Sequence, residues 1–371
     1  MAVDFPLDFR CPISLEVMSD PVIVASGHTF DRSSIQQWID SGHRTCPITM
    51  LPLPPFSPLI PNYALRSLID NFTAGAIAEK NSGKPRSSLS SDPIHLLSSL
   101  SFPADAAELS SLLRLAKDSL AFRRLLADSG APSILLRHAA ASDSPDLQDL
   151  SLRTLLYLSL DGDDVRVGLV ADGALDHLTR VLQSGGPNAA LAATTLTSLS
   201  VVEVNKCTIG AHPAVIPALS FLLLNGKGRE RREATTALYV LCKFPDNRRR
   251  AVRAGVVPGL LCFISDGSER AIQVLGLIAK CKEGREAMSN ADEFIRVLAR
   301  ILREGTARGI EHALLVLNLV CSDSKKIIWG AKEEGVKDIC LLLVEKDNAK
   351  FGRNALTLAR NLEKGELVDF I

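Results

Sequence analysis

The stretch ATTALYVL at residues 234–241 decides the fold, because variants of it recur along most of the chain. Residues 192–199 read AATTLTSL, and residues 271–278 read AIQVLGLI. Each carries a small residue, an apolar residue four positions later and a terminal apolar anchor, a spacing that lies on one helix face. The anchors are Leu158, Leu199, Leu241, Ile278, Leu319 and Leu362, which stand 41, 42, 37, 41 and 43 residues apart.

This period predicts stacked helical repeats, in which each unit buries its apolar face against its neighbours. Six units are recognisable, with a weaker one near 94–121. A glycine precedes the second apolar stretch of four units, where it suits a helix C-cap with positive φ. These glycines are Gly130, Gly173, Gly255 and Gly335.

Two units depart from the pattern. The unit at 247–283 is short by about four residues, as if a loop between its last two helices were trimmed. His312 interrupts the column of small residues, and we expect it to be a partly buried histidine with a local hydrogen bond.

The composition of the 371 residues favours a helical core and excludes several classes of protein. Hydrophobic residues make up 46% and aromatic residues only 5%, so Leu, Ala, Val and Ile must form the core, which suits helices. The 42 Lys and Arg residues balance 42 Asp and Glu residues, so the chain has no net positive charge that would attract nucleic acid. The longest apolar stretches, around 214–224, are too short for an integral membrane segment.

The eight cysteines lack paired spacing, and the N-terminus lacks the features of a signal peptide. We therefore expect reduced thiols in a soluble intracellular protein, located in the cytoplasm with the nucleus as a second location. Basic clusters at 227–232 and 248–253 are either a nuclear-localisation signal or solvated surface, and we favour solvated surface.

Residues 1–75 differ from the rest, because they are rich in proline and contain no lysine. Residues 21–30 predict a hairpin. Asp31 can cap the helix that follows, and Asn62 can cap a last helix over 63–72. Residues 77–93, rich in Ser, Gly and Lys, predict a linker.

The predicted domains are therefore residues 1–76 and 94–371, joined by the linker at 77–93. The linker serines at 87, 88, 90 and 91 are either phosphorylation sites or part of a plain solvated hinge, and composition favours the hinge.

Two loops, at 11–18 and 46–52, flank the small N-terminal core, and both begin Cys-Pro-Ile. The candidate metal ligands are Cys11, His28, His43 and Cys46. They contain no Cys-x-x-Cys pair, whereas structural zinc sites usually have two close pairs, so we expect no metal and no cofactor. Cys46 with His43 lacks an orienting acid and an oxyanion hole, so we expect no catalytic nucleophile.

Both parts resemble known families. The segments CPISLEVMSDPVIV (11–24), GHTFDR (27–32), IQQWI (35–39), TCPIT (45–49) and IPNYALRSLI (60–69) follow the order of the U-box, the metal-free relative of the RING domain. The repeats resemble armadillo repeats, and the combination resembles plant U-box/armadillo-repeat ubiquitin-protein ligases. The resemblance implies a mainly α chain: a small α+β U-box domain followed by an α-solenoid of about six to seven armadillo repeats.

The U-box resemblance implies two sets of site residues. The residues that bind the ubiquitin-conjugating enzyme are Ile13, Leu15, Trp38 and Pro47. A polar network, in place of zinc, includes His28, Asp31 and Arg32. From the residues alone, the apolar set either fills the core or forms an exposed patch of the kind that marks a partner site.

The implied function is recruitment of a ubiquitin-charged conjugating enzyme by the U-box, with a protein substrate selected by the armadillo repeats. Ubiquitin passes to a substrate lysine without a covalent intermediate on this chain, and the rate comes from positioning. Family-level expectation adds signalling and stress response, with a receptor kinase or its downstream component as a partner.

Two other functions stay open. Some family members carry a basic residue where this chain has Met50, so a non-catalytic armadillo adaptor or scaffold with a weak U-box is the alternative. The third function is a peptide-carrier solenoid. Many armadillo proteins place an Asn just before the terminal anchor, and this chain has Asn only at 318 and 361 among those six positions. The other four are Tyr157, Ser198, Val240 and Leu277.

Overall fold

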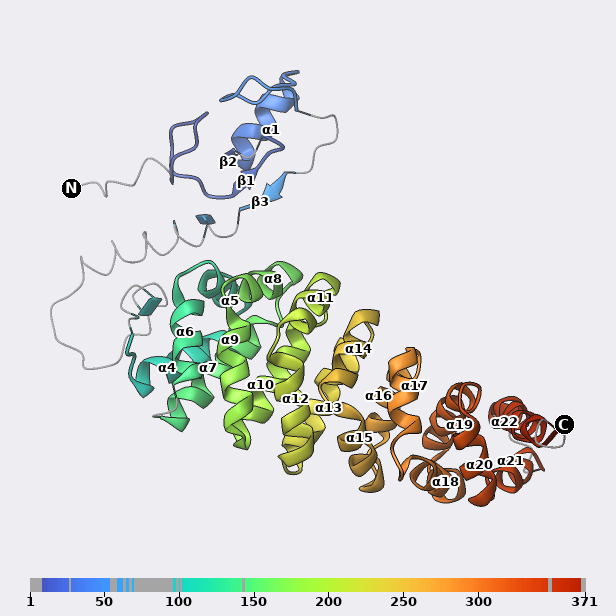
Figure 1. Cartoon of the computed structure of the whole chain (residues 1–371). Helices are drawn as coiled ribbons and strands as arrows, with labels where there is room; N and C mark the ends of the chain where they lie inside the picture. The colour runs from blue at the N-terminus through green and yellow to red at the C-terminus, as the bar shows by residue number, and fades with distance from the viewer. Residues whose placement is uncertain are drawn as a thin grey trace. The chain divides into compact units, whose positions relative to one another are not determined.

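The structure of the chain is a computed structural model (Figure 1). It describes residues 9–26, 28–53, 59–62, 65–66, 69, 96–97, 100, 102–141, 144–345 and 349–367. The chain forms two compact units, residues 1–90 and 91–371, and each has an apolar core of its own. The predicted linker lies outside the described residues.

The first unit combines a small antiparallel sheet with a helix. The strands β1 (Pro21–Ile23), β2 (Thr29–Asp31) and β3 (Ile60–Pro61) take the order β2-β1-β3. Helix α1 (Arg32–Asp40) begins after Asp31, whose side chain accepts the N–H of Ser33 as an N-cap. The predicted hairpin and its capped helix are confirmed.

The core of this unit gathers side chains from both Cys-Pro-Ile loops, the hairpin and α1. Its fully buried residues include Cys11, Val22, Phe30, Ile35 and Cys46. The Asn62 side chain accepts the N–H of Leu65 at 3.1 Å, as expected of a helix cap. Most of the predicted helix over 63–72 lies outside the described residues.

Among the described residues, the second unit contains α4 (Ala106–Asp118) followed by six three-helix repeats. The first helices are α5 (Leu120–Ala127), α8 (Asp163–Ala171), α11 (Glu203–Ala211), α14 (Pro245–Arg253), α17 (Lys282–Ser289) and α20 (Lys325–Glu333). The second helices are α6 (Ala131–Ala140), α9 (Ala174–Ser184), α12 (Val215–Asn225), α15 (Val256–Ser265), α18 (Phe294–Glu304) and α21 (Val336–Glu345). The third helices are α7 (Pro145–Leu158), α10 (Gly186–Leu199), α13 (Arg229–Leu241), α16 (Glu269–Ile278), α19 (Ala307–Cys321) and α22 (Ala349–Leu367).

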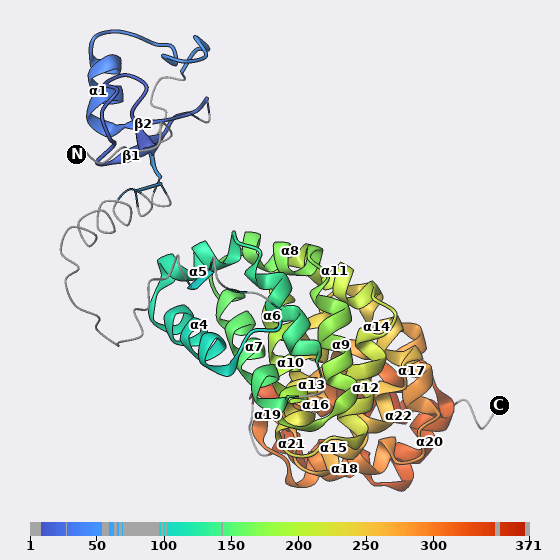
Figure 2. The same cartoon turned by 90° about the vertical axis from the view of Figure 1, so that its left-hand side faces the viewer.

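Third helices pack side by side along this unit, each against the third helix of the next repeat (Figure 2). Helix α4 packs against α7 in the same way, so it serves as the third helix of the weaker unit predicted near 94–121. The core of the repeats forms one continuous cluster, as expected of a solenoid in which neighbours complete one another's cores.

Five of the six predicted anchors are fully buried, but the prediction for Leu319 is wrong. Leu319 is 37% exposed, whereas the adjacent Val320 is fully buried. The small residue of that repeat is therefore Ala313 and not His312, although His312 does make the expected local hydrogen bond, to the carbonyl of Arg308 at 2.8 Å. The error arises because α19 is apolar on most sides, so its pattern does not single out one face.

Two further predictions need correction in detail. Gly173, Gly255 and Gly335 have positive φ as predicted, but Gly130 has φ −71° and needs no glycine-specific conformation. The short repeat loses most of its missing residues from its third helix, and the loop between its last two helices is not trimmed. Helix α16 has 10 residues against 13 in α13, while each is preceded by a three-residue connection.

Buried asparagines connect successive repeats. The side-chain amide of Asn247 donates to the carbonyls of Lys206 at 2.8 Å and Leu241 at 3.0 Å. Asn205, at the same position of the preceding first helix, donates to the carbonyls of Arg166 and Leu199. Each asparagine thus satisfies one carbonyl of the preceding first helix and one at the end of a third helix, which fixes the stacking of the repeats.

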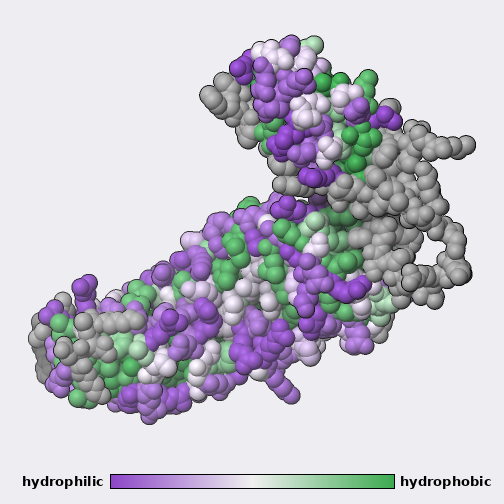
Figure 3. Space-filling view, turned by 180° about the vertical axis from the view of Figure 1, so that it is seen from behind, coloured by the Kyte–Doolittle hydropathy of each residue, from purple (hydrophilic) through white to green (hydrophobic). Residues whose placement is uncertain are grey.

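Hydrophilic residues dominate the face of the repeats drawn in Figure 3, with apolar patches between them. Within the described residues, no single helix is long and apolar enough to cross a membrane. Helices α11 and α12 reach that length and hydropathy only as a pair, and the pair is bent by 79°.

Candidate functional site

The two Cys-Pro-Ile loops of the first unit expose large apolar side chains. The exposed fractions are 69% for Leu15, 47% for Ile48, 66% for Met50 and 59% for Leu51. Burying such a side chain typically stabilises a domain by about 1.5–3 kcal/mol. Four of them left outside a small core therefore indicate a surface kept for a partner.

The two loops share one backbone plan. The N–H of Leu15 donates to the carbonyl of Cys11 at 2.8 Å, and the N–H of Met50 donates to the carbonyl of Cys46 at 2.9 Å. Leu15 and Met50 thus hold equivalent positions, and both have left-handed backbone, with φ of +59° and +58°. This conformation costs about 1–2 kcal/mol for a residue with a Cβ, so each loop holds an apolar side chain at a strained position.

Trp38 connects α1 with the second loop. Its indole N–H donates to the carbonyl of Thr45 at 2.9 Å, and its ring stacks on His43 with centroids 3.9 Å apart. The side chain is partly buried and packs against the core of the unit. Trp38 therefore orients the second loop while the residue itself stays partly exposed.

The four residues predicted to bind a partner differ in exposure. Leu15 is exposed, whereas Ile13, Trp38 and Pro47 are partly buried. Ile13 and Trp38 also pack against the core, so they belong to both the core and the surface. Sequence reasoning missed Ile48 and Leu51, although apolar residues inside a proline-rich loop were the available signal.

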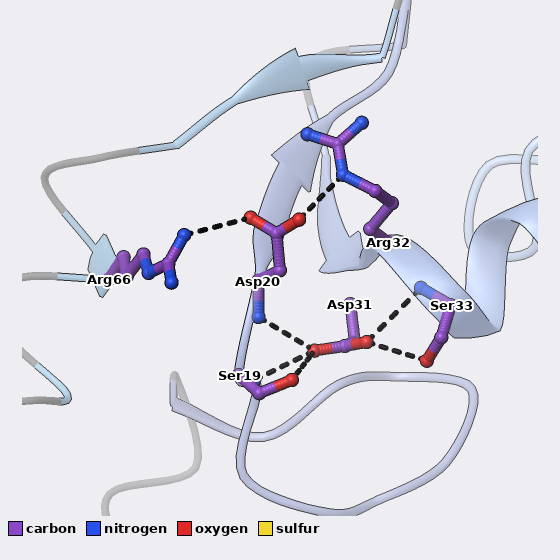
Figure 4. Close-up of polar contacts among 6 residues, drawn as sticks. All are labelled: Ser19, Asp20, Asp31, Arg32, Ser33 and Arg66. Carbon is purple, nitrogen blue, oxygen red and sulfur yellow. Dashed lines mark hydrogen bonds and ion pairs between the residues drawn. The ribbon is translucent and has the colours of Figure 1, made fainter.

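Asp31 is the centre of a polar network at the start of α1 (Figure 4). Its Oδ2 accepts the backbone N–H groups of Ser19 at 2.7 Å and Asp20 at 3.0 Å, and the Ser19 hydroxyl at 3.2 Å. Its Oδ1 accepts the N–H and the hydroxyl of Ser33 at 3.2 and 2.7 Å. Burial raises the pKa of Asp31, but these hydrogen bonds, led by that from Asp20, lower it to about 2.

Asp20 joins two arginines to this network (Figure 4). Its carboxylate pairs with Arg32 at 2.6 Å and with Arg66 at 3.4 Å. Asp31 and Arg32, both predicted members, are thus brought together through Asp20, which the sequence did not single out. These side chains are 35–49% exposed, so each pair contributes only about 0.2–1 kcal/mol.

His28, the third predicted member, belongs to a separate polar group. Its Nδ1 lies 3.2 Å from the carbonyl of Ser26 and 3.5 Å from the Ser26 hydroxyl, which donates to Cys46 Sγ at 3.0 Å. Burial raises the pKa of the Cys46 thiol, but hydrogen bonds from Ser26 and Thr49 lower it to about 7. The described hydrogen bonds of His28 do not include the Asp31 carboxylate.

Among the described residues, no group of three His, Cys, Asp or Glu side chains is arranged to hold a metal ion. Cys11 Sγ instead accepts the N–H of Asp31 at 3.3 Å, which ties the first loop to the start of α1. Hydrogen bonds therefore connect both loops to the hairpin and the helix.

Known proteins match both units of the chain. Residues 5–76 match the U-box domain, and residues 93–350 match the plant U-box protein ARM repeat region. The chain is 50% identical to U-box domain-containing protein 8 of Arabidopsis thaliana, over 98% of each chain. It is 27% identical to E3 ubiquitin-protein ligase PUB23 of the same organism, over 85% of this chain and 81% of the relative.

Solved structures support the fold of the repeats. A designed armadillo repeat protein, in complex with the peptide (KR)4, matches with a TM-score of 0.54 at 18% identity. The match covers 63% of this chain and the whole of the designed protein.

Proposed function

Because the chain belongs to the plant U-box proteins with armadillo repeats, we propose that it is a ubiquitin-protein ligase. Its U-box docks a conjugating enzyme charged with ubiquitin, and its armadillo repeats select the protein substrate. The relative named an E3 ubiquitin-protein ligase supports this activity for the family. The observation that carries the proposal is the exposed apolar surface of the two loops, with Leu15 at 69% exposure and Met50 at 66%.

The proposed docking surface consists of Ile13, Leu15, Trp38 and Pro47. Leu15 offers an exposed apolar contact, and the hydrogen bond from Trp38 to Thr45 fixes the second loop beside α1. Backbone hydrogen bonds within the loops hold their shape before a partner arrives. A surface that is ordered in advance loses less conformational entropy on binding, which favours affinity.

Transfer in this proposal runs directly from the conjugating enzyme to the substrate. The neutral amine of the substrate lysine attacks the thioester carbonyl, an isopeptide bond forms as the amine releases a proton to solvent, and the cysteine of the conjugating enzyme leaves as the thiolate. This chain supplies proximity and orientation and no nucleophile. In the U-box, both cysteines, Cys11 and Cys46, are fully buried, which supports that division of roles for this domain.

A self-ubiquitination assay of the full chain, with a panel of conjugating enzymes, tests the proposal. We expect Leu15→Asn to reduce ubiquitin transfer at least about tenfold, because Asn tolerates the left-handed backbone but removes the apolar contact. Ile13→Ala and Trp38→Ala should also reduce it. Trp329→Ala, a 63% exposed residue of the repeats, is the matched control and should transfer normally.

Circular dichroism separates lost docking from lost folding, since Trp38→Ala also leaves the Thr45 carbonyl without its donor. Full transfer by folded Leu15→Asn and Ile13→Ala would contradict the proposed docking surface. A thioester between ubiquitin and this chain, seen as a band that reducing agent removes, would contradict direct transfer.

Met50 favours a second candidate function, a non-catalytic armadillo adaptor whose weak U-box binds a conjugating enzyme without promoting transfer. Met50 is an exposed apolar residue at the position where some family members carry a cation. If the missing cation limits transfer, Met50→Arg should accelerate it several-fold, whereas the uncharged Met50→Gln should not. If the wild type transfers no ubiquitin and Met50→Arg does, the adaptor function is supported. If the wild type and both variants transfer ubiquitin equally, Met50 gives no reason to propose an adaptor.

A further inference from the structure

Two neighbouring third helices, α13 and α16, carry cations without a carboxylate partner among the described residues. Arg232 and Lys243 belong to α13 and the turn after it, and Arg270 and Lys280 belong to α16 and the turn after it. All four side chains are exposed. We call these four residues the cationic stripes.

The cationic stripes lie side by side on the surface of the repeats. On α13, Arg232 and Lys243 are eleven residues apart, which is three helical turns, so they share one face. That face is opposite to the fully buried Ala234 and Leu238. Helices α13 and α16 pack directly against each other. Arg270 is the exposed residue of α16, and the partly buried Gln273 and Leu277 connect it, at three- and four-residue spacing, to the exposed Lys280.

Tyr239 brings the two stripes together. The guanidinium carbon of Arg270 lies 4.5 Å from the centre of the Tyr239 ring, and the Lys243 ammonium lies 5.0 Å from it. Each cation is attracted by the electrons of the ring, but the two cations repel each other. Arg270 also donates to the side chain of Gln273 at 2.8 Å. Because that partner is neutral, the positive charges of Arg270 and Lys243 stay uncompensated.

Four acidic residues near the stripes have partners other than the stripe cations. Glu230 accepts backbone N–H groups of Gly186 and Lys227, Glu233 pairs with Arg229, Asp266 pairs with Arg231, and Glu269 accepts the Thr306 hydroxyl. The pairs with Arg229 and Arg231 cancel the charges of Glu233 and Asp266, whereas Glu230 and Glu269 bind neutral donors and keep their negative charge. The four cations of the stripes outnumber these two carboxylates, so this part of the surface is locally positive although the whole chain has a net charge of zero.

We propose that the cationic stripes dock an extended, carboxylate-rich segment of a partner protein. The stripes run about 16 Å along α13, so their charges suit several separate Asp and Glu side chains better than one compact phosphate. Neighbouring α19 exposes Leu315 and Leu319, which fit an apolar residue beside the acidic run. This inference names a substrate class for the proposed ligase and rests on that function.

Fluorescence anisotropy with the full chain tests the inference. The probe is a labelled twelve-residue peptide that alternates Asp or Glu with Ser and ends in Leu, and the control peptide has Asn and Gln in place of the acids. We expect the acidic peptide to bind at least about tenfold more tightly at low ionic strength. Its affinity should fall steeply as NaCl rises, because the paired charges are exposed and screened.

Matched variants identify the surface. Lys243→Gln combined with Arg270→Gln should weaken binding of the acidic peptide about five- to thirtyfold. Arg253→Gln combined with Arg300→Gln removes the same charge from exposed residues outside the stripes and should leave binding within about twofold. Equal losses in both double variants, or no loss in the first, would overturn the inference.

Two further probes test whether the stripes prefer a carboxylate-rich segment to other anions. A phosphoserine peptide, or a single-stranded RNA of equal charge, that binds more tightly than the acidic peptide would overturn the assignment. Failure of the inference is also distinct from failure of the proposed function. Self-ubiquitination without binding of the acidic peptide overturns the inference alone. Binding that Lys243→Gln with Arg270→Gln weakens, without any ubiquitin transfer, supports the docking surface and rejects the ligase.

Discussion

At the residue scale, the Asp31 carboxylate makes the stability of the first unit depend on pH. Its folded pKa is about 2, below the ordinary value of 3.8, so the folded state binds the proton more weakly than the unfolded state. The resulting stabilisation is fully present above the ordinary pKa and is lost as pH falls through 3.8 towards 2. It amounts to about 2 kcal/mol.

We expect Asp31→Asn to lower the free energy of unfolding of the first unit by about 1–3 kcal/mol at pH 7, because an amide replaces an acceptor facing five donors. The variant should also lose less stability than the wild type between pH 5 and pH 2, since the titrating group is gone. Urea unfolding followed by Trp38 fluorescence measures both effects, in a Trp329→Phe background that removes the second tryptophan of the chain.

Asp40→Asn is the matched control, because Asp40 is exposed and accepts only one described hydrogen bond, from Gln36. It should change the free energy of unfolding by less than about 0.5 kcal/mol. Similar pH profiles for Asp31→Asn and the wild type would show that other carboxylates govern the response to acid.

Single residues also show which site features a sequence can predict. The Asp31 cap was predictable because an acidic residue directly before a helical pattern is a local signal. The hydrogen bond from Ser26 to Cys46 joins residues twenty positions apart, and no local pattern encodes it. The left-handed backbone of Leu15 and Met50 was equally hidden, since neither residue type suggests positive φ.

At the scale of elements, the helical repeats were predictable where small and large apolar residues alternate on one face. Leu241 and Ile278 are fully buried as predicted. The register failed at Leu319 because α19 is apolar on most sides, and its packing against neighbouring helices, which include α16, α18 and α22, buries Val320 instead. A pattern predicts a helix well, but neighbouring helices decide which of two adjacent apolar residues is buried.

The buried asparagines make a prediction about the stacking of repeats. Asn247→Ala should lower the free energy of unfolding of the repeats by about 2–4 kcal/mol, because the carbonyls of Lys206 and Leu241 lose their donor inside the core. Guanidinium unfolding followed by circular dichroism at the helical band measures the change.

Asn225→Ala serves as the control for Asn247→Ala. Asn225 ends α12, is exposed, and donates to the carbonyl of Phe221 within its own helix. Its removal should cost less than about 1 kcal/mol. Equal losses for the two variants would mean that the connection between repeats adds nothing beyond an ordinary surface hydrogen bond.

At the scale of the whole molecule, the chain forms two units with separate cores, residues 1–90 and 91–371. The sequence predicted domains at 1–76 and 94–371 from the change in composition and period. Between those bounds lie the Ser- and Gly-rich residues 77–93, which fall outside the described residues. The domain bounds at residues 76 and 94 therefore stay predictions from composition.

Separate cores predict separate unfolding, and each unit contains one of the two tryptophans. In the full chain, Phe30→Ala should lower the denaturation midpoint reported by Trp38 and leave the midpoint reported by Trp329 unchanged. Leu275→Ala should do the reverse, because both substituted residues are fully buried, each in the core of its own unit. Each tryptophan is read after the other is replaced by Phe, and one shared midpoint in all variants would contradict two independent units.

The strained tips at Leu15 and Met50 have an evolutionary consequence. Selection for stability alone should favour Gly, Asn or Asp at both positions, because these residues adopt left-handed backbone at lower energy. If these residues bind a conjugating enzyme as proposed, a descendant lineage that no longer recruits the enzyme would be free to accept that change and would gain stability by it. Gly, Asn or Asp at both tips of a related protein would therefore mark relaxed selection, and would date the loss of recruitment to the branch where the apolar residues disappear.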